Sequence, residues 1–292
     1  TASASLTLDE AGQPRLSVSW RDEPVLLPSP LGAQFADDRL ERDLRITGTR
    51  TREHDARYRF VAGKAREGRD HYRELEVDLA DAQGRTLGLV LRAYDDGIAF
   101  RYRLPLPAQG DLMVRQDLTG YLFPRDYRCW SFNVGRFNTP HEGEFDPIQA
   151  SKIRPMHLID LPLVCETGRG QATFAIAEAD LDRYAAFYLS GRGDGRLGLD
   201  TRLSPRHDTP EFAVRIPRAE VAAGGHLTPW RVLMLGDSPG ALVESNLIAH
   251  LNPPTPIEDT SWIVPGKSAW DWWSGSVAPD VPEPGMNTAT RR

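Results

Sequence analysis

The chain has 292 residues, long enough for one large domain or two of ordinary size with a sizeable core. Hydrophobic residues make up 40% and charged residues 26%, which is typical of a folded globular protein. The formal net charge of -6 argues against a nucleic-acid surface, which needs clustered Lys and Arg. No apolar run approaches the roughly twenty residues of a membrane-spanning helix, and none resembles a signal-peptide core. We therefore expect no nucleic-acid partner and no membrane span, and if the protein is exported its signal has been removed.

The N-terminal hundred residues alternate apolar and polar positions between turn signals, as antiparallel strands do. The predicted strands are Leu6–Leu8, Arg15–Trp20, Pro24–Leu27, Tyr58–Val61 and Tyr72–Leu79. This part of the chain therefore predicts a β-meander.

The clearest local signal is a β-hairpin over residues 87–104, with Asp95-Asp96-Gly97 between two alternating segments. An Asp-Gly pair favours a tight turn, because glycine adopts the positive φ that such turns require. The two arginines that follow the turn should face away from the core, on the side opposite to Phe100, Tyr102 and Leu104.

Residues 110–147 are aromatic and irregular, and further strands follow up to residue 235. One helix is predicted over residues 238–251, because Ser238 can cap it, Pro239 suits its first turn and leucines recur at near-helical spacing. Many strands, one or two short helices and no fixed-period repeat predict an all-β fold, a large antiparallel sandwich.

Two cysteines, Cys129 and Cys165, can form one disulfide or remain as buried thiols. A single pair is not the disulfide framework of a small secreted domain, so the composition favours buried thiols.

The signature motifs of several enzyme classes are missing, so the chemistry must be sought among isolated carboxylates. Glu178 ends an apolar strand, where it is either a hard-oxygen ligand for a cation such as Ca²⁺ or a solvated side chain. Glu142 and Glu144 are separated by one glycine, and they either share one side of an extended loop or belong to a solvated acidic loop. Spacing alone favours the solvated alternative for all three residues.

Four histidines, His141, His157, His207 and His226, are candidates for a general base, since histidine titrates near neutrality. No pattern in the sequence orients any of them toward a partner. Structural or surface roles are therefore favoured.

Four of the seven tryptophans fall within twelve residues, Trp262–Trp273. Aromatic side chains at this density usually fill a core or line a site. Trp272 and Trp273 either stack on a sugar ring or form a packed wedge between domains. The segment is expected to lead into a further domain.

Several motifs, taken in order, resemble the N-terminal domain of glycoside hydrolase family 97. They are Ser29-Pro-Leu-Gly32, Tyr94-Asp-Asp-Gly-Ile-Ala-Phe-Arg-Tyr102, Glu178-Ala-x-Leu-x-x-Tyr184, Thr228-Pro-Trp-Arg231 and the tryptophan-rich stretch from Asp259 to Trp273. The resemblance implies a β-supersandwich similar to the galactose-mutarotase fold, followed by a (β/α)8 catalytic barrel and a small C-terminal β domain. It also implies an exo-acting, Ca²⁺-dependent α-glucosidase or α-galactosidase of the periplasm or the secreted fraction.

By this resemblance the chain divides into a β-supersandwich over residues 1–258, a tryptophan-rich linker over 259–286 and the start of the barrel over 287–292. The implied calcium ligand is Glu178, and the implied substrate-pocket residues are Glu142, Glu144, Trp272 and Trp273. Both catalytic carboxylates would belong to the barrel, which needs about 250 residues, so we expect no catalytic residue here and no activity from this chain alone.

The first hypothesis is thus a non-catalytic domain that completes the pocket and calcium site of its own barrel, for an α-linked oligosaccharide substrate. The alternative is a free-standing carbohydrate-binding module, with the tryptophans and the aromatics of residues 121–145 as a stacking platform. A third hypothesis is a mutarotase-like epimerase that uses a His and Glu pair as acid and base. No histidine in the sequence lies in a motif that indicates such a role, which argues against this hypothesis.

Overall fold

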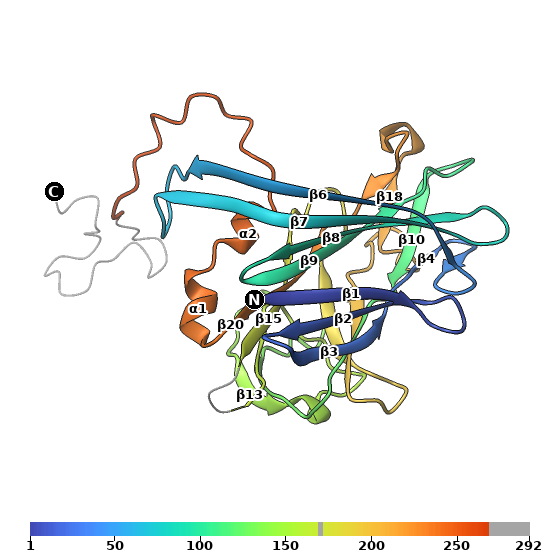
Figure 1. Ribbon diagram of the computed structural model, residues 1–292, viewed down its shortest axis with the longest axis horizontal. Helices are drawn as coiled ribbons and strands as arrows, with labels where there is room; N and C mark the ends of the chain where they lie inside the picture. Colours follow the sequence, from blue (N-terminus) through green and yellow to red (C-terminus); the bar gives the residue numbers. More distant parts are fainter. Residues whose placement is uncertain (169–171, 269–292) are drawn as a thin grey trace, which may run out of the picture. The chain divides into compact units, whose positions relative to one another are not determined.

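A computed structural model describes residues 1–168 and 172–268, and antiparallel strands dominate it (Figure 1). The chain forms two compact units. The first unit comprises Thr1–Tyr58 and Gly68–Pro254, and it carries the sheets described below. The second comprises Arg59–Glu67 and the chain from Thr255 onward, where the described residues form turns and Trp262 is exposed. Trp272, Trp273 and the expected barrel start at 287–292 lie outside the described residues.

Three sheets are present among the described residues. A six-stranded sheet has the order β1-β2-β3-β11-β17-β16, and a four-stranded sheet has the order β18-β10-β4-β5. A ten-stranded sheet has the order β13-β12-β14-β15-β20-β9-β8-β7-β6, with β19 beside β9.

The strands are β1 (Ala2–Leu8), β2 (Pro14–Trp20), β3 (Glu23–Pro30), β4 (Ala33–Phe35), β5 (Arg39–Leu40), β6 (Arg45–Arg59), β7 (Glu67–Ala80), β8 (Thr86–Tyr94), β9 (Gly97–Leu104), β10 (Leu112–Asp117), β11 (Gly120–Leu122), β12 (Arg128–Ser131), β13 (Asp146–Gln149), β14 (Leu163–Glu166), β15 (Thr173–Ala179), β16 (Phe187–Gly191), β17 (Gly198–Leu203), β18 (Val214–Ile216), β19 (His226–Leu227) and β20 (Trp230–Gly236). The helices are α1 (Pro239–Glu244), α2 (Leu247–His250) and the 3-10 turns η1 (Ala150–Lys152) and η2 (Arg218–Glu220).

The main hydrophobic core joins inward-facing residues of the six-stranded and ten-stranded sheets. Leu16 and Val18 on β2 belong to the same buried cluster as Phe100 and Leu104 on β9. The predicted hairpin is confirmed, since β8 pairs with β9 and the alternate residues Phe100, Tyr102 and Leu104 are buried.

The role expected of Gly97 is wrong, although the hairpin is right. Tyr94 pairs with Gly97, so Asp95 and Asp96 form the turn, and Gly97 does not have a positive φ. A Cβ at Gly97 would lie 2.6 Å from the carbonyl oxygen of Leu233 and would also meet a methyl group of Leu247. Glycine is needed here because the neighbouring chain packs too closely for a side chain.

The predicted single helix is two short ones. Ser238 caps α1 by accepting a bond from Ala241 N, as expected. The helix stops at Ser245, whose backbone is extended and whose hydroxyl donates to Asp96 Oδ2 at 2.6 Å. Because this hydroxyl also accepts from Leu247 N (3.1 Å), the serine ends the first helix and fixes the start of the second.

The expectation of two buried thiols is also wrong, because Cys129 and Cys165 form a disulfide. Cys129 on β12 lies directly opposite Cys165 on β14, so strand register alone brings the two side chains together. Both residues are fully buried in the main core.

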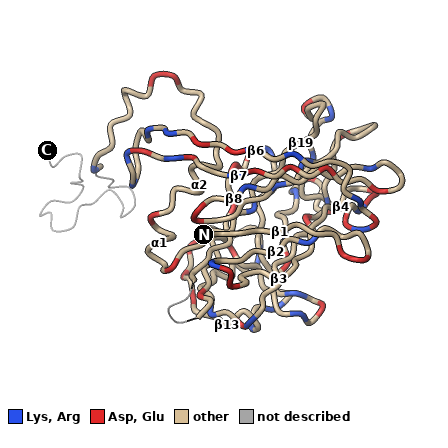
Figure 2. Tube along the Cα trace, in the orientation of Figure 1, with Lys and Arg blue, Asp and Glu red and all other residues tan. Residues whose placement is uncertain are grey.

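The strand β6 is much longer than predicted, since only Tyr58–Val61 was expected to be extended there. Figure 2 shows basic and acidic residues interspersed along β6 and β7. Cross-strand ion pairs join Arg50 to Glu76, Arg52 to Glu74, Glu53 to Arg73 and Asp55 to Arg69. We call these pairs the β6–β7 ladder.

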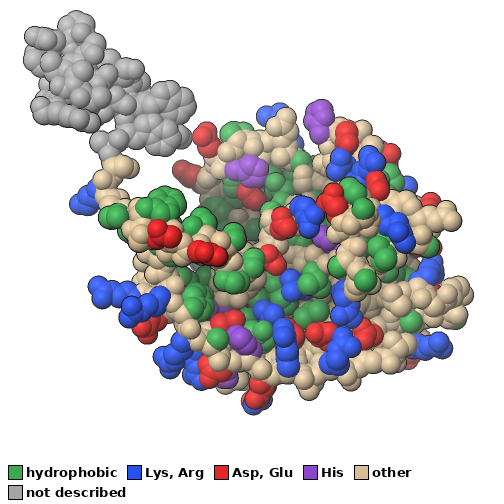
Figure 3. Space-filling model, turned by 90° about the horizontal axis from the view of Figure 1, so that it is seen from above, with side chains coloured by type: hydrophobic (Ala, Val, Ile, Leu, Met, Phe, Trp, Pro, Cys, Tyr) green, Lys and Arg blue, Asp and Glu red, His purple; other side chains and the backbone are tan. Residues whose placement is uncertain are grey.

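Figure 3 shows a face on which acidic and basic side chains are interspersed, with apolar side chains visible between them. Within residues 1–168 and 172–268, none of the helices has both the length and the apolar character to cross a bilayer.

Candidate functional site

Glu178 and Arg231 occupy facing positions on two central strands. β15 pairs with β20, and this register places Glu178 directly opposite Arg231. The neighbours Ala177 and Ala179 are buried, and the Glu178 side chain itself is only 10% exposed. The prediction that Glu178 is a solvated strand-end carboxylate, which spacing favoured, is therefore wrong.

Arg231 is the centre of a buried ionic triad with Asp117 and Glu178. Its Nε and Nη2 donate to Asp117 Oδ2 at 2.9 and 2.8 Å, and its Nη1 donates to Glu178 Oε1 at 2.6 Å. The Arg231 side chain has no exposed surface, and its guanidinium lies 4.5 Å from the ring centroid of Phe187. Since Asp117 ends β10, the triad ties the four-stranded sheet to the ten-stranded one.

The electrostatics of the triad are dominated by burial. Burial raises the pKa of Glu178 to about 6, although Arg231 acts in the opposite direction and Asp117 adds to the rise. Burial also lowers the pKa of Arg231, but Asp117 and Glu178 offset that effect, so the net pKa is raised. A carboxyl group with a raised pKa is stabilised in its charged form by any further cation brought to it.

The calcium ion implied by the family resemblance requires six to eight oxygen ligands. Among the described residues, no three His, Cys, Asp or Glu side chains lie close enough together to hold a metal ion. Glu178 has one oxygen bound to Arg231, and its buried, weakly acidic carboxyl suits one hard-oxygen ligand. Among the described side chains, Glu178 therefore fits the contribution of one ligand to such a site.

His141 has a partner that the sequence did not suggest. Its Nδ1 lies 2.6 Å from Asp160 Oδ2, and its backbone is held at a φ of 56°. The Tyr188 ring on β16 lies 6.2 Å from the His141 ring and packs edge-on against Phe137. Burial raises the pKa of Tyr188, with smaller contributions from Asp160 and Glu178, so this cluster lies within electrostatic reach of the triad.

Of the other three histidines, two have contacts within the fold and one lies at the surface. His157 Nδ1 accepts from Arg154 N at 3.2 Å, and His207 is exposed. His226 stacks on Tyr184, and burial lowers its pKa.

Glu142 and Glu144 are both exposed on the segment between β12 and β13. A Cβ at Gly143, between them, would collide with the Phe132 ring, so the glycine allows the loop to pack there. Within the described residues these carboxylates do not form a metal-binding group with Glu178.

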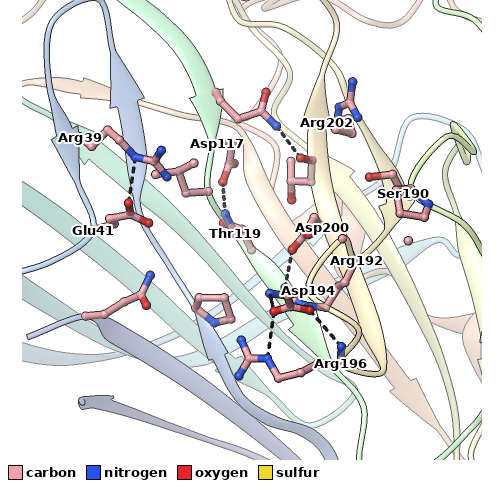
Figure 4. A pocket seen from close by; sticks show the side chains of 18 of the residues that line it. Arg39, Glu41, Asp117, Thr119, Ser190, Arg192, Asp194, Arg196, Asp200 and Arg202 are labelled. Carbon is pink, nitrogen blue, oxygen red and sulfur yellow. Dashed lines mark hydrogen bonds and ion pairs between the residues drawn. The ribbon is translucent and has the colours of Figure 1, made fainter. Parts of the chain in front are cut away.

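Asp117 also lines a polar hollow of about 520 Å³ (Figure 4). The arginines around it are largely neutralised by neighbouring carboxylates. Arg192 binds Asp194 and Asp200, and Arg39 binds Glu41 at 2.8 Å. No aromatic ring is among its lining residues, so it lacks a surface on which a sugar could stack.

The fold defines a class of protein, the large antiparallel β-domain that is also found in solved glycoside hydrolases. The backbone matches a glycoside hydrolase family 97 enzyme in complex with acarbose from a Pseudoalteromonas strain, with a TM-score of 0.81 and 24% identity. That match covers 91% of this chain and 38% of the other. A crystal structure of a β-arabinopyranosidase matches with a TM-score of 0.66 and 23% identity, over 80% of this chain and 38% of the other. The predicted all-β supersandwich is confirmed.

The family described as Glycosyl-hydrolase 97 N-terminal matches residues 1–254, and the chain belongs to it. A probable retaining α-galactosidase of Streptomyces bingchenggensis is 32% identical over 93% of this chain. A retaining α-galactosidase of Bacteroides thetaiotaomicron is 28% identical over 88%. The chain spans 40% and 41% of the length of these relatives, so it corresponds to one part of each of them.

Proposed function

We propose that this domain is non-catalytic and completes the active-site pocket and calcium site of a (β/α)8 barrel, within an exo-acting α-glycosidase. One named relative is a retaining α-galactosidase and the other is described as a probable one, which supports terminal α-galactosidic bonds as the substrate over α-glucosidic ones. The barrel would supply the two carboxylates that glycoside hydrolysis requires.

The observation that carries the proposal is that Glu178 is buried and has a raised pKa. A buried carboxyl with a pKa of about 6 is costly to ionise, and an adjacent cation offsets that cost. Bound calcium would supply positive charge to orient a sugar or to support a catalytic acid. Arg231 holds one oxygen of Glu178 in place, so the carboxylate meets the cation already oriented.

The test is Glu178→Gln in the full-length enzyme, with the metal removed first. Calcium affinity measured by titration calorimetry should fall at least about tenfold, or about 1.4 kcal/mol, because an amide oxygen carries no net charge. The matched control is Glu166→Gln, a half-buried carboxylate on β14 in the same sheet. Unchanged calcium affinity in Glu178→Gln would show that this residue is not a ligand.

Periplasmic or secreted localisation belongs to the same proposal. The Cys129–Cys165 disulfide supports it, because such bonds persist in oxidising compartments and are rare in the cytosol. Thiol counting by mass spectrometry on protein from cell fractions tests this. Two free thiols in the native protein would contradict it.

A further inference from the structure

The polar hollow of Figure 4, of about 520 Å³, carries more positive than negative charge. Six arginines and four carboxylates are among its lining residues, so the formal balance is two positive charges. Two ion pairs reach residues outside the lining, from Arg15 to Asp9 and from Asp117 to Arg231. Because these outside partners carry opposite charges, the positive balance does not change when they are included.

Each of the four carboxylates that line the hollow already has an arginine partner. Asp117 is bound at both oxygens, since its Oδ2 accepts from Arg231 at 2.8 and 2.9 Å and its Oδ1 accepts from Thr119 N at 2.9 Å. A paired carboxylate repels an incoming anion less than an isolated one, because the opposite charge beside it offsets its field. The other pairs are Glu41 with Arg39, Asp194 with Arg192 and Arg196, and Asp200 with Arg192.

Arg42 and Arg202 are the source of the excess positive charge. Both side chains line the hollow and are exposed, and neither forms an ion pair or a hydrogen bond with any residue in 1–168 or 172–268. Arg202 lies on β17, and Arg42 follows β5. Figure 4 shows Arg202 on one side of the hollow, with Arg39 and Glu41, which precede Arg42 in the chain, on the other. Two uncompensated guanidinium groups therefore reach this hollow from different segments.

The hollow also offers polar side chains without a partner. Ser190 is 3% exposed and Gln13 is 8% exposed, and both line the hollow. Among the described residues, neither side chain forms a hydrogen bond, and neither has polar atoms that are sealed from solvent. A largely buried hydroxyl or amide is normally hydrogen-bonded, so these two groups are satisfied by whatever fills the hollow. Both can donate to an anion.

These groups suit a tetrahedral oxyanion, such as phosphate. A guanidinium group matches the oxygens of phosphate with two parallel hydrogen bonds, and it stays charged at any physiological pH. A doubly charged anion also matches the positive balance of the hollow. Small-molecule pockets span roughly 300–1,000 Å³, so this hollow has room for a phosphate group together with a sugar ring that carries it.

We propose that this hollow binds a doubly charged oxyanion, either free phosphate or a phosphate group carried by a sugar. Arg42 and Arg202 are its ion partners, and Ser190 and Gln13 donate hydrogen bonds to it. Because both arginines are exposed, binding should weaken as ionic strength rises. The site does not depend on the role proposed for Glu178, so either proposal can fail without the other.

The test is an NMR titration of the 292-residue chain, labelled with ¹⁵N at glycine, with inorganic phosphate. The resonances to follow are the backbone N–H groups of Gly191 and Gly193, which line the hollow. We expect a saturable shift with a Kd on the order of 1 mM at low ionic strength. Arg42→Gln and Arg202→Gln should each weaken binding at least about fivefold, or about 1 kcal/mol. Both side chains are exposed, so both variants should fold.

The matched control is Arg57→Gln on β6. Arg57 is likewise exposed and has no ion pair within the described residues, so its loss should leave the Kd unchanged. If Arg57→Gln weakened binding as much as the two hollow variants, the phosphate would be responding only to overall charge, and the proposal would be wrong.

Titrations with D-galactose 6-phosphate and with neutral D-galactose separate the possible sources of the anion. Tighter binding of the sugar phosphate than of inorganic phosphate supports a phosphate carried by a sugar, and equal or weaker binding supports the free ion. No saturable shift with either phosphate up to about 50 mM would overturn the proposal. An equal shift with D-galactose, or an equal Kd in the wild type and both hollow variants, would overturn it too, since charge would then be uninvolved.

Discussion

Two groups of arginine–carboxylate pairs in this domain differ mainly in their access to water. In the triad, Arg231 has no exposed side-chain surface and Asp117 is 2% exposed. In the β6–β7 ladder, Arg73 is 82% exposed and its partner Glu53 is 69% exposed, although Glu74, the partner of Arg52, is only 1% exposed. Charge pairs interact more strongly away from water, but removing them from water costs free energy.

The two groups of ion pairs therefore have different structural roles. Arg231 bonds to a carboxylate 114 residues away, on another sheet, and to one directly across the strand pair. The ladder joins residues of one hairpin that backbone pairing already holds together. The triad therefore ties two sheets together, whereas the exposed pairs of the ladder, such as Arg73–Glu53, join strands that are already paired and contribute little to stability.

The largest effect should come from Arg231→Met, which leaves two buried carboxylates without a counterion. We expect unfolding free energy to fall by about 3–5 kcal/mol, because a broken buried pair leaves uncompensated charge. Urea denaturation measures this through the midpoint at constant slope. A loss below about 1 kcal/mol would mean that the two groups of pairs do not differ as proposed.

Replacing the whole triad separates the cost of an unpaired buried charge from the net contribution of the triad. The triple variant Asp117→Leu, Arg231→Met and Glu178→Leu removes every buried charge, so it should be more stable than Arg231→Met alone by about 2 kcal/mol or more. The same denaturation experiment compares the two proteins. If the triple variant is the less stable one, the triad contributes net stability beyond avoiding unpaired charge.

The next effect in size is a pH dependence of stability that comes from Glu178 in the triad. The folded pKa of Glu178 is about 6 against an ordinary value of 4.5, so between these values the folded state binds more protons than the unfolded state. The stability contributed by Glu178 should thus fall by about 2 kcal/mol as pH rises from below 4.5 to above 6. Wild type and Glu178→Gln should be compared by urea denaturation in calcium-free buffer. Identical pH dependence in the two would contradict the raised pKa.

The smallest effect should come from Arg73→Ala in the ladder. An exposed pair contributes roughly 0–1 kcal/mol, and salt screens it, so the loss should shrink further at high ionic strength. Denaturation at low and high salt checks this. A loss as large as that of Arg231→Met would remove the distinction between buried and exposed pairs.

Much of the fold was predictable because local patterns encode it. The alternation of Phe100, Tyr102 and Leu104 fixed a buried face, and Ser238 marked a helix start. By contrast, β6 has charged residues at successive positions in place of an apolar face, so its length left no periodic signal. The predicted helix is divided into α1 and α2 because Ser245 donates a hydrogen bond to Asp96, which lies 149 residues earlier in the sequence.

The site was predictable only in part. The motif beginning at Glu178 singled out this residue, but spacing favoured a solvated side chain, and its burial and its contact with Arg231 depend on strand register. The pairing of Cys129 with Cys165 depends on register in the same way. Likewise, His141 and Asp160 lie on two different loops, and residue spacing in the sequence does not predict that these loops meet.

The position of β6 at the border of its sheet bears on how copies of this domain meet. A border strand offers unpaired backbone groups to which another chain can add. Five arginines of β6 (Arg45, Arg50, Arg52, Arg57 and Arg59) outnumber its two acidic residues. If two β6 strands met edge to edge, arginines would come close to arginines, and like charges across a strand pair repel. These arginines therefore discourage aggregation through this edge.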